Sequence, residues 1–204
     1  NWLNGRWRTQ PKMMIVDLDR GLRAGLDRHV GHLQNIEHLE WSPDGRYLAF
    51  SASQTPPDRD IFVLDFQTMQ VQQQTSFGFA TDSPTWSPDG TRIAFATNYD
   101  RVPSVYEVTV DLARPPRAPR IVSEMFGLRR VMGLDWSPSG DLLYSDDRAV
   151  GILSLNPDTG RSNIVFNVPF AYQVSISPDG ARVCFMAPIS PRASGSGLYW
   201  TCFN

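Results

Sequence analysis

Three histidines, His29, His32 and His38, are the side chains whose type and spacing come nearest to a metal site. They are all the histidines of the chain and fall within one short stretch, and imidazoles that converge can bind zinc or a similar ion. No cysteine or acidic pair with a recognised ligand spacing accompanies them. We therefore favour solvated loop histidines, keep a metal site as the alternative, and expect no cofactor.

Two further stretches hold reactive groups, and neither has the spacing that its chemistry needs. The run from Asp17 to Asp19 resembles the start of a calcium loop, but Gly21 and Arg28 stand at the fifth and twelfth positions, which need oxygen ligands. The Ser-Gly-Ser-Gly run at 194–197 lacks the Gly-x-Ser-x-Gly spacing of a nucleophile elbow. We therefore predict that the protein is not an enzyme.

Arginines alternate with prolines in a long predicted loop. Arg114, Arg117 and Arg120 are separated by three prolines, and Arg129 and Arg130 follow nearby. Such a segment could be a docking arm for an acidic partner. A stiff, solvated, extended loop is the favoured interpretation, because proline-rich segments take that shape unaided.

Composition narrows the possible partners. The chain has 204 residues, of which 41% are hydrophobic, so it can bury a full core. Its 19 basic and 21 acidic side chains give a net charge of -2, which argues against charge-driven binding to nucleic acid or to an anionic membrane. Its apolar runs are too short to span a bilayer. The sequence opens without a charged-then-apolar leader, so no export signal is expected within it.

A repeated five-residue motif organises the elements that must position these side chains. The four copies are Trp41-Ser-Pro-Asp-Gly45, Trp86-Ser-Pro-Asp-Gly90, Trp136-Ser-Pro-Ser-Gly140 and Ile176-Ser-Pro-Asp-Gly180. Proline presets φ at the second position of a turn, and the final glycine accepts a positive φ. We therefore predict four equivalent turns, closed by Gly45, Gly90, Gly140 and Gly180.

The residues between the motifs predict strands and no long helix. In the first unit, alternating or apolar runs at 36–41, 47–50, 61–64 and 71–75 indicate four antiparallel strands. A period near 45 residues fits one four-stranded propeller blade. The third unit departs from the pattern, with Ser139 in place of Asp and Ser145 where the other units have Phe, so that blade is expected to be looser or differently directed.

The motif, followed two residues later by an Ile/Leu-Ala-Phe strand, resembles the TolB-type propeller repeat over roughly residues 36–204. The resemblance implies an all-β propeller that acts as a non-enzymatic binding scaffold for a protein or peptide partner, in the bacterial periplasm or another extracytoplasmic space. An accessory subunit of a membrane-associated complex is the alternative. A metal-dependent enzyme with a site in the tunnel is a third possibility, because oligogalacturonate lyases have similar propellers.

The repeat divides the chain into one partial blade and four blades that carry the motif. The expected boundaries are 1–35 for the partial blade, 36–80, 81–130 and 131–170 for complete blades, and 171–204 for an incomplete one. Residues 13–18 and 24–29 are predicted as the third and fourth strands of the partial blade. TolB-like propellers typically have six blades, so we expect a segment of a larger propeller, or an open ring whose edges another chain covers.

The two cysteines fall on the second and third strands of the last unit. Cys184 and Cys202 are equidistant from the centre of the predicted hairpin, so they could lie opposite each other and form a disulfide, as cysteines of exported proteins often do. Against this, Cys184 aligns with Ala49 and Ala94, where a small buried residue is enough. Both alternatives stay open.

Overall fold

The computed structural model describes residues 13–97, 102–125, 130–146, 151–168 and 170–187, and the backbone alone of residues 2–3, 6–7, 188 and 198–203. Within these residues the chain is almost entirely β-structure, and α1 (Asp27–Val30) is its one short helix. No helix of the described part is long and apolar enough to cross a membrane.

Four antiparallel sheets follow one another along the chain, each with its strands in sequence order. Blade 1 contains β5 (Gln34–Trp41), β6 (Tyr47–Ser53), β7 (Asp60–Asp65) and β8 (Gln70–Gln73). Blade 2 contains β9 (Thr81–Trp86), β10 (Arg92–Thr97), β11 (Ser104–Thr109) and β12 (Arg120–Glu124). Blade 3 contains β13 (Val131–Trp136), β14 (Leu142–Asp146), β15 (Ile152–Leu155) and β16 (Ser162–Phe166). Blade 4 contains β17 (Tyr172–Ile176), β18 (Val183–Pro188) and β19 (Leu198–Phe203). The predicted all-β fold of four-stranded antiparallel blades is confirmed.

Each motif forms a tight turn between the first and second strands of its blade. In blade 1 the Gly45 N–H donates to the Ser42 carbonyl at 2.9 Å, and the Ser42 hydroxyl donates to Asp44 at 2.6 Å. The terminal glycines have φ of 70° at Gly45, 68° at Gly90, 94° at Gly140 and 71° at Gly180. These left-handed conformations explain why the turn ends in glycine.

The third motif turn is one residue shorter than the others, and this corrects the expectation for Ser145. Trp136 pairs with Leu142, whereas Trp41 pairs with Leu48, one position farther along the chain. Tyr144 therefore takes the buried aromatic position of the second strand, and it packs in one cluster with Ala94 and Ala96 of blade 2. The blade is not loosened, because every residue of β14 is buried.

The cores lie between adjacent blades. Alternate residues of each second strand point to the two neighbours, so Ile93 and Phe95 pack towards blade 1 while Ala94 and Ala96 pack towards blade 3. The outer face of blade 1 packs against the N-terminal segment, in a cluster that includes Met13, Leu26, Val30, Leu48 and Phe50. The apolar second strand predicted from the sequence is thus buried on both faces.

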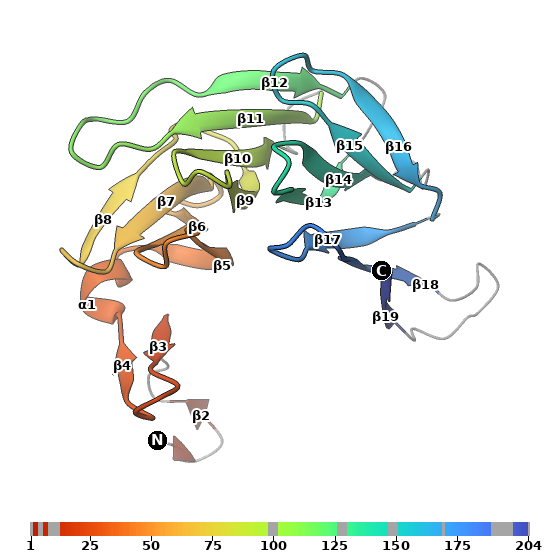
Figure 1. Cartoon of the computed structure of the whole chain (residues 1–204). Coiled ribbons are helices and arrows are strands. Elements are labelled where there is room, and N and C mark those ends of the chain that lie inside the picture. Colours follow the sequence, from red (N-terminus) through yellow and green to blue (C-terminus); the bar gives the residue numbers. More distant parts are fainter. Residues whose placement is uncertain are drawn as a thin grey trace.

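The N-terminal partial blade differs in part from its prediction. Residues 13–18 supply β3 (Met14–Val16), and residues 24–29 supply only the end of β4 (Arg23–Gly25), because the chain turns into α1 at Asp27. β3 and β4 pair with each other alone. Figure 1 shows the result as an arc, with this hairpin at one end and blade 4 at the other. No strand pairing among the described residues joins the two ends.

The backbone register places the two cysteines opposite each other. Cys184 on β18 pairs with Cys202 on β19. Cys184 is disulfide-bonded, and the chain contains no third cysteine. We propose on this basis a disulfide that ties β19 to the blade.

Candidate functional site

The first strands of the four blades lie on the inner side of the arc (Figure 1). Residues of β5, β9, β13 and β17 line a cavity of about 530 Å³, here called the axial pocket. Innermost strands surround the central channel of a propeller. The pocket is therefore lined by the innermost strands of four blades that pack against one another.

A β-bulge shapes the wall of the axial pocket in each blade. The register of each first strand shifts before its motif, and His38, Ser83 and Gln173, three residues before their motifs, have φ between 52° and 54°. In blade 3 the same place holds Gly133, where a Cβ atom would lie 2.6 Å from the Val174 N atom. Bulges redirect side chains, and all four residues line the pocket.

Asp135 connects three blades at the end of the pocket that lies next to the motifs. Its carboxylate accepts hydrogen bonds from the Thr85 hydroxyl of blade 2 at 3.0 Å and from the Ile176 N–H of blade 4 at 2.7 Å. The Trp136 N–H donates to it at 2.8 Å. Burial raises the pKa of Asp135 above its ordinary value, although these three hydrogen bonds oppose the shift.

Glu40 occupies the equivalent place in blade 1, immediately before its motif. Among the described residues no side chain or N–H group is within hydrogen-bonding or ion-pairing distance of its carboxylate. Burial raises the pKa of Glu40 to about 7, and the negative charge of Asp135 adds to the shift. The axial pocket thus contains one satisfied carboxylate and one that no protein group satisfies.

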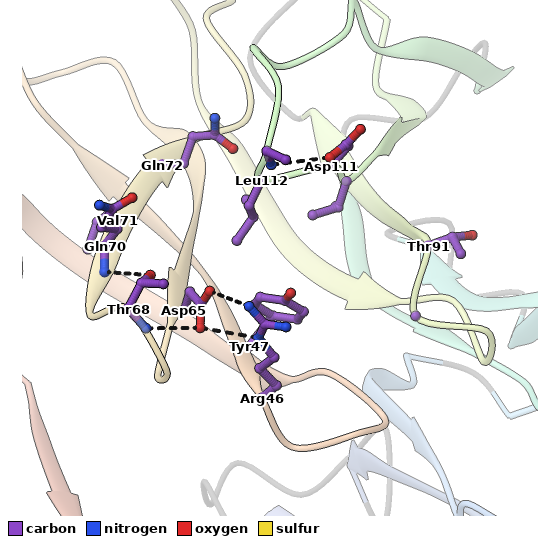
Figure 2. Close-up of a pocket in the computed structure, with 13 residues that line it drawn as sticks. Arg46, Tyr47, Asp65, Thr68, Gln70, Val71, Gln72, Thr91, Asp111 and Leu112 are labelled. Carbon is purple, nitrogen blue, oxygen red and sulfur yellow. Dashed lines mark hydrogen bonds and ion pairs between the residues drawn. The ribbon is translucent and has the colours of Figure 1, made fainter.

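A second cavity, of about 760 Å³, lies on the outer side between blades 1 and 2, and it is here called the rim pocket. Figure 2 shows Arg46 and Asp65 facing each other in it, beside Tyr47. The Arg46 guanidinium lies 2.8 Å from the Asp65 carboxylate, and Asp111 pairs with Arg114 at 3.5 Å. Because its charged groups already satisfy one another, the rim pocket offers a ligand less than the axial pocket does.

The three histidines do not converge. His29 lies in α1, His32 in the turn after it and His38 in β5, where the His38 Nδ1 atom lies 3.2 Å from the Ser51 hydroxyl. In the part of the chain that the structure describes, no group of three or more His, Cys, Asp or Glu side chains could hold a metal ion.

Of the five arginines proposed for docking, the four that the structure describes are not on one surface. Arg120 pairs with Glu107 at 2.9 Å and donates to the Pro157 carbonyl, so it joins blades 2 and 3. Arg114 and Arg117 are exposed in the loop between β11 and β12, while Arg130 lines the axial pocket. Arg129 lies outside the described residues.

Sequence reasoning did not single out Glu40 and Asp135, the carboxylates of the axial pocket. They are far apart in the chain, and each stands directly before a motif. That shared position was the available signal, since equivalent residues of a repeat meet around its axis.

Antiparallel blades arranged in an arc around an axial pocket define the class of β-propellers. The TolB beta propeller domain matches residues 7–196, and the chain belongs to this family.

The Tol-Pal system protein TolB of Francisella tularensis subsp. mediasiatica is 26% identical over 197 residues, which cover 92% of this chain and 42% of that protein. The crystal structure of TolB from Acinetobacter baumannii has a TM-score of 0.72 at 20% identity, over 93% of this chain and 45% of that one. The chain therefore spans less than half of either relative. An oligogalacturonate lyase from Vibrio parahaemolyticus has a TM-score of 0.57 at 13% identity, over 90% of this chain and 54% of that one, and shares the fold alone.

Proposed function

We propose that this chain is a non-enzymatic, protein-binding propeller that holds an extended segment of a partner protein in the axial pocket. One observation carries the proposal: rigid strands of four blades converge on a cavity in which Glu40 and Arg130 both lack a partner among the described residues. Pockets with a few convergent polar groups are the usual binding sites of a fold. Among the described residues, no group of three or more His, Cys, Asp or Glu side chains gives specific support to a metal-dependent enzyme.

The relatives suggest the setting of this interaction. The Francisella relative is named as a protein of the Tol-Pal system, and we infer a related role for this chain, in the bacterial periplasm and with a protein partner from a membrane-associated assembly. Because those relatives are longer than this chain, the inference concerns only the propeller.

A second candidate is a structural subunit whose open blade edge is covered by another protein. It is supported by Trp41, which is 47% exposed, whereas Trp86 and Trp136 in the equivalent places of blades 2 and 3 are 5% exposed each. The two candidates place the partner on different surfaces, so they can be separated.

Site-directed photo-cross-linking in the native bacterium separates them. A photoreactive residue is placed at Gln173 in the axial pocket, at Gln70 in the rim pocket, or at Val16 on β3, in three otherwise identical proteins. We expect a discrete cross-linked protein from position 173 alone. Cross-links from position 16 alone would favour the structural subunit, and cross-links from position 70 alone would contradict both candidates.

A further inference from the structure

Glu40 differs from the residues at the equivalent place in the other three blades. The Thr85 hydroxyl donates a hydrogen bond to Asp135, whose own oxygens are occupied by groups of blades 2, 3 and 4, and Ser175 also acts on that carboxylate by lowering its pKa. Glu40 lines the same pocket without any such donor among the described residues. A half-buried carboxylate without a hydrogen-bond donor loses part of its hydration and gains no protein contact in return. A donor group of a bound ligand would compensate for that loss.

We propose that Glu40 makes the axial pocket selective for a cationic group, namely the ammonium or guanidinium of a lysine or arginine side chain in the bound segment. The inference rests on the proposed function and adds the chemistry of the ligand. A guanidinium or ammonium supplies both the charge and the N–H donors that a carboxylate accepts. Asp135 contributes its negative field, although its oxygens are already bonded within the protein.

A metal ion fits this place less well than an organic cation. Glu40 and Asp135 are two carboxylates, and no third His, Cys, Asp or Glu joins them among the described residues. Calcium takes six to eight oxygen ligands, and Asp135 has committed both of its oxygens to N–H and hydroxyl donors. The pair therefore suits a ligand that brings its own donors.

Arg130 does not neutralise the carboxylates. It stands just before β13, five residues before Asp135, which corresponds to roughly 16 Å of extended chain at ~3.3 Å per residue, and no ion pair joins it to either carboxylate among the described residues. The two ends of the pocket therefore have opposite charge. A bound segment would place its cation beside Glu40 and a neutral or acidic residue beside Arg130.

Binding of the cation should strengthen as pH rises, because only the ionised carboxylate attracts it. Burial raises the pKa of Glu40 to about 7, so its ionised fraction rises about tenfold between pH 6 and pH 8. The other titratable or charged groups in the pocket are His38 on β5, Arg130 and Asp135 of blade 3, and Tyr172 on β17, and β9 contributes none.

The test uses agmatine, which carries a guanidinium and an ammonium, as the probe. Agmatine is titrated into the isotope-labelled protein in the presence of EDTA, with the uncharged analogue N-butylurea as the chemical control. We expect saturable amide shifts confined to β5, β13 and β17, with an affinity at least fivefold higher at pH 8 than at pH 6. N-butylurea should give none.

Glu40→Gln removes the charge and keeps the shape, and Glu124→Gln is the matched control on the outer strand β12. We expect at least tenfold weaker agmatine binding for E40Q and parental binding for E124Q. Unchanged binding by E40Q, or shifts that CaCl₂ produces and agmatine does not, would overturn the proposal. If position 173 still cross-links a partner, the binding function stands without the charge selectivity. If agmatine binds but no partner is cross-linked from the pocket, the proposed function fails instead.

Discussion

At the residue scale, substitution of the glycine that ends each motif tests whether the turn depends on a positive φ at that position. Gly45 has φ of +70°, and a Cβ atom there would meet nothing within 4 Å, so any cost of substitution comes from the backbone alone. Gly45→Val should destabilise the fold by about 1–3 kcal/mol, because a β-branched residue is strained at positive φ.

Gly45→Asn is the matched control, since asparagine tolerates the left-handed region. Urea denaturation of both variants measures the difference. Equal stability of the valine variant and the parent would show that the turn does not require this conformation.

Glu40 also predicts how stability depends on pH. Its pKa rises from 4.5 in the unfolded chain to about 7 in the folded protein, so the folded state holds the proton more tightly. Its contribution is therefore most favourable below pH 4.5 and is lost as the pH rises through 7. The free energy of unfolding should fall between pH 5 and pH 8 in the parent and fall less steeply in Glu40→Gln. Parallel pH profiles of the two proteins in urea denaturation would contradict the shift.

The cysteine pair gives a covalent prediction at the same scale. Cys184 and Cys202 are opposed in the register of β18 and β19, so we expect no free thiol in the unfolded, unreduced protein and two after reduction. Thiol titration in denaturant measures both values. Two free thiols before reduction would exclude the disulfide.

At the scale of the elements, Asp135 predicts cooperation between blades. Asp135→Ala removes the acceptor of hydrogen bonds from Thr85 and Ile176, and leaving buried donors unsatisfied costs about 1–3 kcal/mol each. Asp111→Ala is the control, because Asp111 pairs with the nearby Arg114 on an exposed loop, and such pairs contribute little.

A double-mutant cycle with Thr85→Val measures the coupling between blades 2 and 3. The combined loss should be smaller than the sum of the single losses, since both substitutions break the same hydrogen bond. Additive losses would show that Asp135 does not connect the blades.

The sequence predicted well the elements that the repeated motif marks, namely the motif turn and the apolar second strand of each blade. The turn residues and the apolar second strands identified each blade, because proline, glycine and alternating hydrophobic residues have direct local meaning. The bulges were not predictable, because Ser83 and Gln173 are not residue types that ordinarily indicate a left-handed conformation, and His38 alone, although histidine is enriched there, does not define a repeated feature. Residue types alone did not align the second strand of blade 3 with the second strands of the other blades. Its motif turn is one residue shorter, so Tyr144 rather than Ser145 takes the buried aromatic position.

At the scale of the whole molecule, the question is how the arc ends. The N-terminal hairpin has a buried side, where Ile15 packs against blade 1, and an opposite side on which Met14 is 51% and Val16 43% exposed. In blade 1, Trp41 lacks the cover that Trp86 receives from Tyr47 of the preceding blade. The exposed side is apolar, as an interface between blades is, so local packing supports an open edge at this end of the arc.

This open edge should make the purified chain associate with itself unless a partner covers it. Exposed apolar strand edges promote pairing, and a charge placed on them prevents it. Val16→Lys should therefore lower the apparent mass in light scattering and the binding of a hydrophobic dye. Ile164→Lys is the matched control, because Ile164 is 56% exposed on β16, the outer strand of a complete blade, and its substitution should change neither. If the parent is monomeric at high concentration and binds no dye, the edge needs no partner, and the free-standing binding propeller is favoured over the structural subunit.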